Sequence, residues 1–143
     1  MTVITGFTGP LEDRIAIREL TESYADTAFR SDREGWLGCW TDDCVWITPF
    51  GEVRGKAGLT EQWGQIGATF GVIGFFPLLA AVAIDGDRAV ARSYVHEIAA
   101  QHDGGLYKVV GQYDDELVRH NGAWRFARRS YTALIRESGT ALA

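Results

Sequence analysis

The sequence has few of the residues that mark disulfide-rich, metal-binding or redox proteins. Its 143 residues include only two cysteines, Cys39 and Cys44, with no CxxC pair and no neighbouring histidine. A disulfide scaffold and a structural zinc site are therefore not expected, and we interpret both residues as reduced, partly buried thiols. The three histidines lie in different segments. We predict a protein that works without metal and without a cofactor.

Long apolar runs and clusters of basic residues are also missing. No segment reaches the roughly 18 apolar residues of a membrane-spanning helix, and the N-terminal MTVITGFTGP lacks the basic start of a signal peptide. The net charge is −5 and the 14 lysines and arginines are scattered, which argues against a phosphate backbone as partner. We expect a soluble, cytoplasmic protein that binds neither membranes nor nucleic acids.

Hydrophobic residues, in contrast, are plentiful enough for one core. They make up 46% of the chain and aromatics 12%, which predicts a single domain over residues 1–143. In the first half, Pro10 followed by two acids begins a pattern in which Ile17, Leu20 and Tyr24 recur at helical spacing. This pattern predicts a helix over residues 10–30.

Shorter elements follow this helix. Ser31 and Glu34 have the spacing of a capping box and predict a second, short helix around Trp36, which the segment TDDC ends. The next segment, CVWITPF, has the composition of a strand. A narrow apolar stripe from Leu59 to Phe70 then predicts a third helix, weakened by its glycines.

From residue 74 onward the hydrophobic period changes from helical to alternating. Turn signals interrupt the alternation at 85–86 (DG), 103–105 (DGG) and 121–122 (NG), which predicts four antiparallel strands in a meander. Helices followed by an antiparallel sheet define an α+β class, with the helices packed on one face of the sheet.

The alternation also predicts which residues face the core. A two-residue turn at Asp85-Gly86 would pair Phe76 with Val95 and Gly74 with Glu97 on a small, apolar inner face. Glu97 would be the one acid on that face. The opposite parity carries His96 beside polar and aromatic neighbours, so we interpret His96 as a surface or dimer-contact residue.

Several segments resemble the SnoaL-like branch of the NTF2-like superfamily. These are ELTESYADTAF, WLGCWTDDCVWITPFGEVRG, AIDGDRAVARSYV, GQYDDELVR and NGAWRFARR, and the resemblance covers nearly the whole chain, about residues 10–135. The resemblance implies a cone in which three N-terminal helices pack on a curved antiparallel sheet around a pocket. This fold hosts dehydratases, cyclases, isomerases and dehydrochlorinases. It also hosts non-catalytic dioxygenase β subunits, which the segment WLGCWTDDCVWITPF resembles.

Relatives that eliminate water or HCl use a buried Asp–His pair as general base, and this chain departs from that pattern. The resemblance places Phe29 at the position of the aspartate and Gly74 near that of the histidine. Asp26 lies on the same helix but would point away from that position. We interpret Asp26 as an exposed residue that pairs with Arg30 at i+4.

Other residues remain candidates for a site. Glu97, opposite the vacant histidine position, is the candidate base. Arg129 matches, by resemblance, an arginine that holds a leaving group, and Glu97 or a ligand carboxylate would have to neutralise it. A two-residue turn at Asn121-Gly122 would instead turn Arg128 and Ser130 inward, so the inward position of Arg129 requires a longer loop or a bulge. By resemblance, Tyr24, Trp46, Tyr113 and Tyr131 belong to the pocket wall, and Tyr113 is the third catalytic candidate. The ligand-binding candidates are Tyr24, Phe29, Trp46 and Tyr131, together with Phe76 from its predicted place on the inner face.

Two functions are compatible with these candidates. One is a protein that binds a small hydrophobic, cyclic or aromatic metabolite and acts as a cofactor-independent lyase, isomerase or cyclase. The other is a non-catalytic ligand-binding or assembly subunit similar to a dioxygenase β subunit. In either case the outer-face residues Arg92, Tyr94, His96 and Ile98 favour a homodimer through the sheet.

Overall fold

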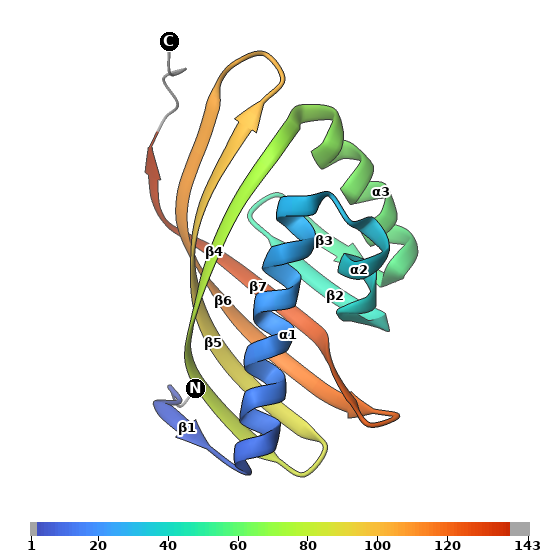
Figure 1. The fold of residues 1–143 in the computed structure, drawn as a ribbon, viewed down its shortest axis with the longest axis vertical. Coiled ribbons are helices and arrows are strands. Elements are labelled where there is room, and N and C mark those ends of the chain that lie inside the picture. Colours follow the sequence, from blue (N-terminus) through green and yellow to red (C-terminus); the bar gives the residue numbers. More distant parts are fainter. Residues whose placement is uncertain (1–2, 138–143) are drawn as a thin grey trace.

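A seven-stranded sheet wraps around one side of the first helix (Figure 1). The computed structural model describes residues 3–137. The elements of that range are, in chain order, β1 (Gly6–Thr8), α1 (Leu11–Arg30), α2 (Arg33–Gly38), β2 (Trp40–Thr48), β3 (Gly51–Arg54), α3 (Gly55–Thr69), β4 (Phe70–Asp85), β5 (Arg88–Gln101), β6 (Leu106–His120) and β7 (Ala123–Glu137).

The sheet has the order β1-β4-β5-β6-β7-β2-β3 and is mixed. The strands β4 to β7 form the predicted antiparallel meander. The expectation of a purely antiparallel sheet is wrong, because β1 pairs with β4 and β2 pairs with β7 in parallel. Both strands precede the meander, and each is joined to its parallel partner by a long connection that includes α3, as parallel pairing requires. The α+β class is confirmed.

Helix α1 packs along β4 and supplies much of the core (Figure 1). Its acids Glu12 and Asp13 occupy the first turn, where the helix dipole favours them. Ile17 and Tyr24 are almost fully buried, as the helical spacing predicted. The helix ends at Arg30, and its C-cap Ser31, whose φ of 54° lies in the left-handed region, turns the chain toward α2.

The connection to β2 differs from the prediction in two places. The N-cap of α2 is Asp32, whose side chain accepts a hydrogen bond from the Gly35 backbone, and not Ser31. Strand β2 begins at Trp40, so TDDC lies inside the strand and does not precede it. Asp42 and Asp43 are both exposed between the buried Trp40 and Cys44, so the acids of this strand remain in solvent. Cys39 and Cys44 are both buried and unpaired, as predicted.

The register predicted for the first hairpin, β4–β5, is wrong. The two-residue turn is Gly86-Asp87, with Asp85 opposite Arg88, and a bulge lies between Leu79 and Ala81. The bulge changes which face the β4 residues occupy, so Phe75 and not Gly74 is opposite Glu97. On β5 itself the prediction is confirmed: the alternate residues from Ala89 to Glu97 face the inside of the protein.

No helix within residues 3–137 has both the length and the apolar character needed to cross a membrane.

Candidate functional site

Two adjoining chambers lie between the sheet and the helices. The first has a volume of about 480 Å³ and the second of about 450 Å³, and both are lined predominantly by aromatic and aliphatic side chains. They share the wall formed by Trp46, Ile66, Phe70, Glu97 and Tyr113. A mostly apolar cavity with a few polar groups is the usual form of a small-molecule site.

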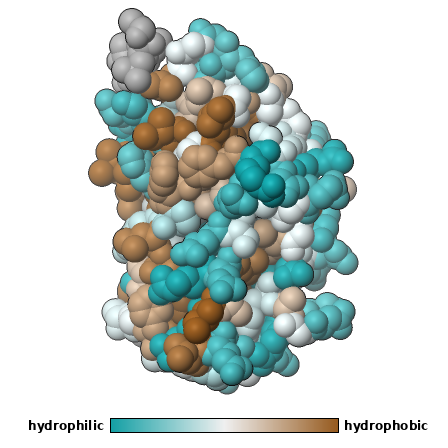
Figure 2. Space-filling view, viewed as in Figure 1, coloured by the Kyte–Doolittle hydropathy of each residue, from teal (hydrophilic) through white to brown (hydrophobic). Residues whose placement is uncertain are grey.

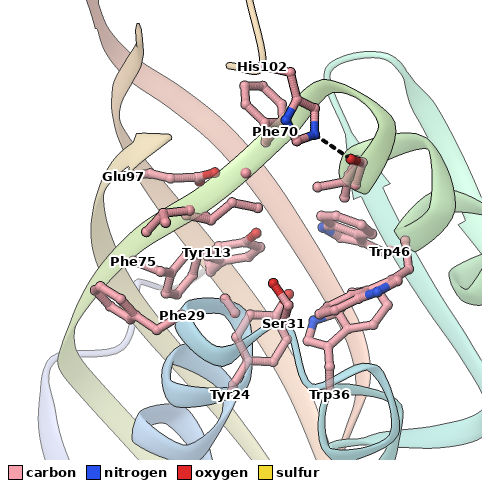
Figure 3. A pocket seen from close by; sticks show the side chains of 17 residues that line it. Tyr24, Phe29, Ser31, Trp36, Trp46, Phe70, Phe75, Glu97, His102 and Tyr113 are labelled. Carbon is pink, nitrogen blue, oxygen red and sulfur yellow. Dashed lines mark hydrogen bonds between the residues drawn. The ribbon is translucent and has the colours of Figure 1, made fainter. Parts of the chain in front are cut away.

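Glu97 projects from β5 into this cavity (Figure 3). Its cross-strand neighbours are Phe75 and Val109, which offer it neither charge nor a side-chain hydrogen bond. Burial alone raises the pKa of Glu97 to about 7, well above the usual value of about 4.3. Near neutral pH this carboxyl is therefore divided between its acid and its base form.

Two tyrosines, Tyr113 and Tyr131, line the chambers together with Glu97. Tyr113 directs its ring and hydroxyl toward the first chamber, and its ring centre lies 5.0 Å from that of Tyr131 (Figure 3). Burial raises the pKa of Tyr113 well above its ordinary value, and burial followed by the charge of Glu97 raises the pKa of Tyr131. Both phenols therefore remain protonated and able to donate a hydrogen bond at neutral pH.

Arg129 lies beneath the cavity floor and lines neither chamber. Its Nε and Nη2 atoms donate to the two oxygens of Asp115 at 2.8 and 3.1 Å, and both side chains are almost fully buried. The guanidinium carbon lies 3.9 Å from the ring centre of Tyr113 and 4.5 Å from that of Tyr24. Although burial by itself would lower the pKa of Arg129, the charge of Asp115 raises it, so the guanidinium stays charged.

The prediction that Glu97 or a ligand would neutralise Arg129 is therefore wrong. Asp115 takes that role because it shares the inner face with Tyr113, two residues away on β6, and is directly opposite Arg129 on β7. We do not retain Arg129 as a clamp for a leaving group. Its surroundings make it part of the core that supports the tyrosines.

The orientation of the last strand is decided by a bulge. The Asn121-Gly122 turn has two residues, as its sequence predicted, and His120 is opposite Ala123. A register shift between Glu116 and Leu117 then adds one residue to β7, which turns Arg129 and Tyr131 inward and leaves Arg128 exposed. Of the two alternatives left open by the sequence, the bulge is the one observed.

Gly111 makes room for the Tyr131 side chain. A Cβ atom at this position would collide with the ring and hydroxyl of Tyr131. The glycine thus lets Tyr131 lie flat against β6 at the wall of the second chamber.

The remaining predicted site residues fall into two groups. Tyr24 and Phe29 line the first chamber and Trp46 lines both. Phe76 lines neither chamber: the bulge in β4 places it on the outer face, where 55% of it is exposed. Its ring packs edge-on against that of Phe29, 5.3 Å between centres.

The positions implied for the missing dyad are neighbours in space. A Cβ atom on Gly74 would lie 3.8 Å from Cε1 of Phe29. Asp26, in contrast, is exposed and pairs with Arg30 at 3.0 Å, which confirms the interpretation of a surface ion pair. His96 is exposed on the outer face, as its parity predicted.

Sequence reasoning missed most of the other residues that line the first chamber, among them Trp36, Trp63 and His102. Trp36 and Trp63 pack with ring centres 5.0 Å apart, and the aromatic content of both helices was the available signal. His102 gave no signal, because it belongs to a turn. Its Nε2 lies 2.9 Å from the Gly67 carbonyl oxygen and its backbone NH donates to Thr69, so the β5–β6 turn is bound to the end of α3 (Figure 3).

The mouth of the first chamber is apolar at its rim. Figure 2 shows hydrophobic side chains gathered over the upper half of β4. Val72, 65% exposed, belongs to this strand and lines the chamber, and Phe29 is 40% exposed. An apolar rim of this kind suits the entry of a hydrophobic ligand.

Comparison with known families agrees with this architecture. Residues 9–130 match the model of the SnoaL-like domain. The chain belongs to the SnoaL-like domain family. The family resemblance seen in the sequence is thereby confirmed, together with the NTF2-like fold. No curated protein sequence matches the chain.

Solved structures show the same fold over most of the chain. A candidate aromatic ring hydroxylase from Novosphingobium aromaticivorans is 29% identical, with a TM-score of 0.86 over 93% of this chain and 96% of that one. A candidate scytalone dehydratase from the same organism is 21% identical, with a TM-score of 0.80 over 93% and 89%. A hexachlorocyclohexane dehydrochlorinase from Novosphingobium barchaimii is 16% identical, with a TM-score of 0.79 over 90% of each chain. The last two likenesses concern the fold alone.

Proposed function

We propose that this SnoaL-like protein binds a small hydrophobic, cyclic or aromatic metabolite and removes a proton from one of its carbon atoms, as a cofactor-independent lyase or isomerase. The observation that carries the proposal is Glu97, a carboxyl on the wall of an aromatic cavity, with no charged or hydrogen-bonded side-chain partner among residues 3–137. A carboxylate in such surroundings is a stronger base than one in water, and its pKa near 7 matches the working range of a general base.

Each polar group of the cavity has a place in this chemistry. The ionised Glu97 takes the proton. Tyr113 donates a hydrogen bond to the oxygen on which negative charge develops, since its phenol stays protonated. Trp46 and the other aromatic side chains hold the substrate and exclude water, which strengthens both polar interactions.

The absence of the Asp–His pair is compatible with this proposal. In the relatives, that pair would occupy the positions of Phe29 and Gly74, at the edge of the first chamber. Glu97 is a base on another strand of the same cavity. It needs no histidine, because burial alone brings its pKa into the working range.

The test is proton exchange in heavy water with a bicyclic aromatic ketone, α-tetralone, as probe. The wild-type protein should exchange the α protons faster than buffer alone, with a rate that rises with pH around an apparent pKa of about 7. Glu97→Gln should lose at least about 10²-fold in rate while its affinity for the probe changes little. Full retention of exchange by Glu97→Gln would contradict the proposal.

A second candidate is a non-catalytic ligand-binding or assembly subunit. The observation in its favour is that Arg129 is bound by Asp115 and does not reach the cavity, so no lysine or arginine among residues 3–137 lines the cavity to hold an anionic leaving group. The likeness to a chain named for aromatic ring hydroxylation supports an aromatic ligand under either function. Tight binding of aromatic probes without exchange by the wild-type protein would favour it.

We also propose that the outer sheet face joins two copies of the chain. Tyr94, His96 and Ile98 lie on this face, and next to them Phe76 and Leu78 are exposed by 55% and 63%. Arg92 contributes less than expected, because its Nη1 donates to the Ile4 carbonyl of the N-terminal segment at 2.7 Å. Light scattering at micromolar concentration should give the mass of a dimer, and the mass of a monomer would exclude it.

A further inference from the structure

The two chambers meet at Glu97, and this arrangement restricts which substrate can react. Their common wall consists of residues from β2, α3, β4, β5 and β6, with Glu97 among them. The carboxyl therefore lies at the junction of the chambers. A proton presented to it must come from the part of the ligand that lies at this junction.

The outer parts of the two chambers have different walls. The first extends between the end of α1 and the start of β4, beside Ala28, Phe29 and Val72. The second extends under the β2–β3 hairpin and is lined there by Gln62, Tyr107 and other residues that the first does not touch. Each chamber alone lies in the lower half of the range of pocket volumes, roughly 300–1,000 Å³, that bury drug-sized ligands.

We propose that the substrate is an elongated, two-ring hydrophobic carbonyl compound that occupies both chambers at once, with its acidic carbon between the two rings. This inference rests on the proposed role of Glu97 as base and adds the shape of the substrate. One ring lies in the first chamber and the other in the second. The carbon between them is then the atom nearest to the carboxylate.

The proton transfer balances without any further reactant. The Glu97 carboxylate takes a proton from the α carbon, the electrons of the broken C–H bond form the enolate, and the enolate oxygen accepts a hydrogen bond from Tyr113. Return of the proton, or of a deuteron from heavy water, to the same carbon gives exchange. Its return to another carbon of an unsaturated substrate gives isomerisation.

Two isomeric ketones test the position of the reacting carbon. Dihydrochalcone carries its exchangeable CH₂ between two phenyl rings, whereas para-benzylacetophenone has the same formula and carries its exchangeable CH₃ at one end. Each exchange rate is divided by the buffer rate of the same ketone, which removes differences in acidity. We expect the acceleration to be at least tenfold larger for dihydrochalcone, and equal acceleration of both isomers would overturn the inference.

Two variants test whether both chambers are occupied. Ala28→Leu narrows the first chamber and Gln62→Trp the second, and each should weaken dihydrochalcone binding on the order of tenfold, measured by calorimetry. Acetophenone, with one ring, should respond to only one of them. The matched controls Ser23→Leu and Gln65→Trp change exposed positions on the same helices and should leave binding unchanged. If either chamber variant fails to affect dihydrochalcone, the substrate does not span both.

The wild-type protein provides a measurement that does not depend on how the variants fold. Adding the second ring, from acetophenone to dihydrochalcone, should raise affinity roughly 10- to 100-fold, the gain expected from burying one more phenyl group. No gain would overturn the inference. Binding that depends on both chambers, combined with no exchange above buffer, would contradict the proposed function and leave the two-chamber binding mode intact.

Discussion

Glu97 and Asp115 are carboxylates on the inner face of the same sheet, on the neighbouring strands β5 and β6. Asp115 accepts hydrogen bonds from Nε and Nη2 of Arg129 and lies in the core. Glu97 has only burial acting on its pKa and faces the cavity. Both carboxylates are removed from water, so what distinguishes Asp115 from Glu97 is its charged partner, Arg129. A paired buried charge contributes to a defined structure, whereas an unpaired one is available for chemistry.

Breaking the paired site should have the largest effect. In Arg129→Met, Asp115 loses its partner and remains buried, which should cost about 3–5 kcal/mol in free energy of unfolding. Urea denaturation at pH 7 measures this. The double variant Arg129→Met with Asp115→Leu should recover most of the loss, because no uncompensated charge remains. A loss below about 1 kcal/mol in the single variant would show that the pair is not essential to the core.

Removing the charge of Glu97 should raise the free energy of unfolding, whereas breaking the Arg129–Asp115 pair lowers it. Below pH 4 Glu97 is protonated in both the folded and the unfolded chain, so Glu97→Gln should change little. Between about pH 4.3 and 7 the unfolded chain ionises first, and the wild-type protein loses stability as pH rises. At pH 8, Glu97→Gln should therefore be more stable than wild type by about 3 kcal/mol. A variant that is equally or less stable at pH 8 would show that Glu97 carries no burial penalty.

Displacing a tyrosine beside Glu97 should have a smaller effect. Gly111→Ala forces the Tyr131 ring away from β6, at a cost of about 1–3 kcal/mol for overpacking. Ligand binding in the second chamber should weaken as well. The double variant Gly111→Ala with Tyr131→Ala should regain part of the stability, since the collision is gone. Thermal unfolding of the three variants distinguishes this outcome from a general loss at residue 111.

The exposed carboxylate of Asp26 should give the smallest effect on stability. Asp26 pairs with Arg30 on the surface of α1, with both side chains more than 60% exposed. Solvent screens such a pair, so Asp26→Ala should change the free energy of unfolding by less than about 0.5 kcal/mol and leave proton exchange unchanged. A larger loss of exchange would indicate that Asp26 and not Glu97 supplies the base.

The sequence predicted those features that depend on local patterns. Helix α1, the turn at Asn121-Gly122 and the inward direction of Glu97 follow from periodicity and turn chemistry. The bulge after Leu79 could not be predicted, because it leaves the pattern of small apolar residues on β4 intact. It is the reason why Phe76 points outward.

Features that depend on pairing between distant strands were harder to predict. The partner of Arg129 had a signal in the sequence, since Asp115 shares the parity of Tyr113 on β6, but the correct register of β7 was needed to use it. The contact of His102 with Gly67 depends on where α3 ends relative to the β5–β6 turn. No local pattern encodes that position.

The most direct test is a pH titration of the Glu97 carboxyl carbon by NMR in carbon-13-labelled protein, with Glu97→Gln for assignment. An unpaired, buried carboxyl that acts as base at the junction of two chambers should titrate with a pKa of about 7. A pKa of about 4, the value of a solvated glutamate, would contradict the central claim.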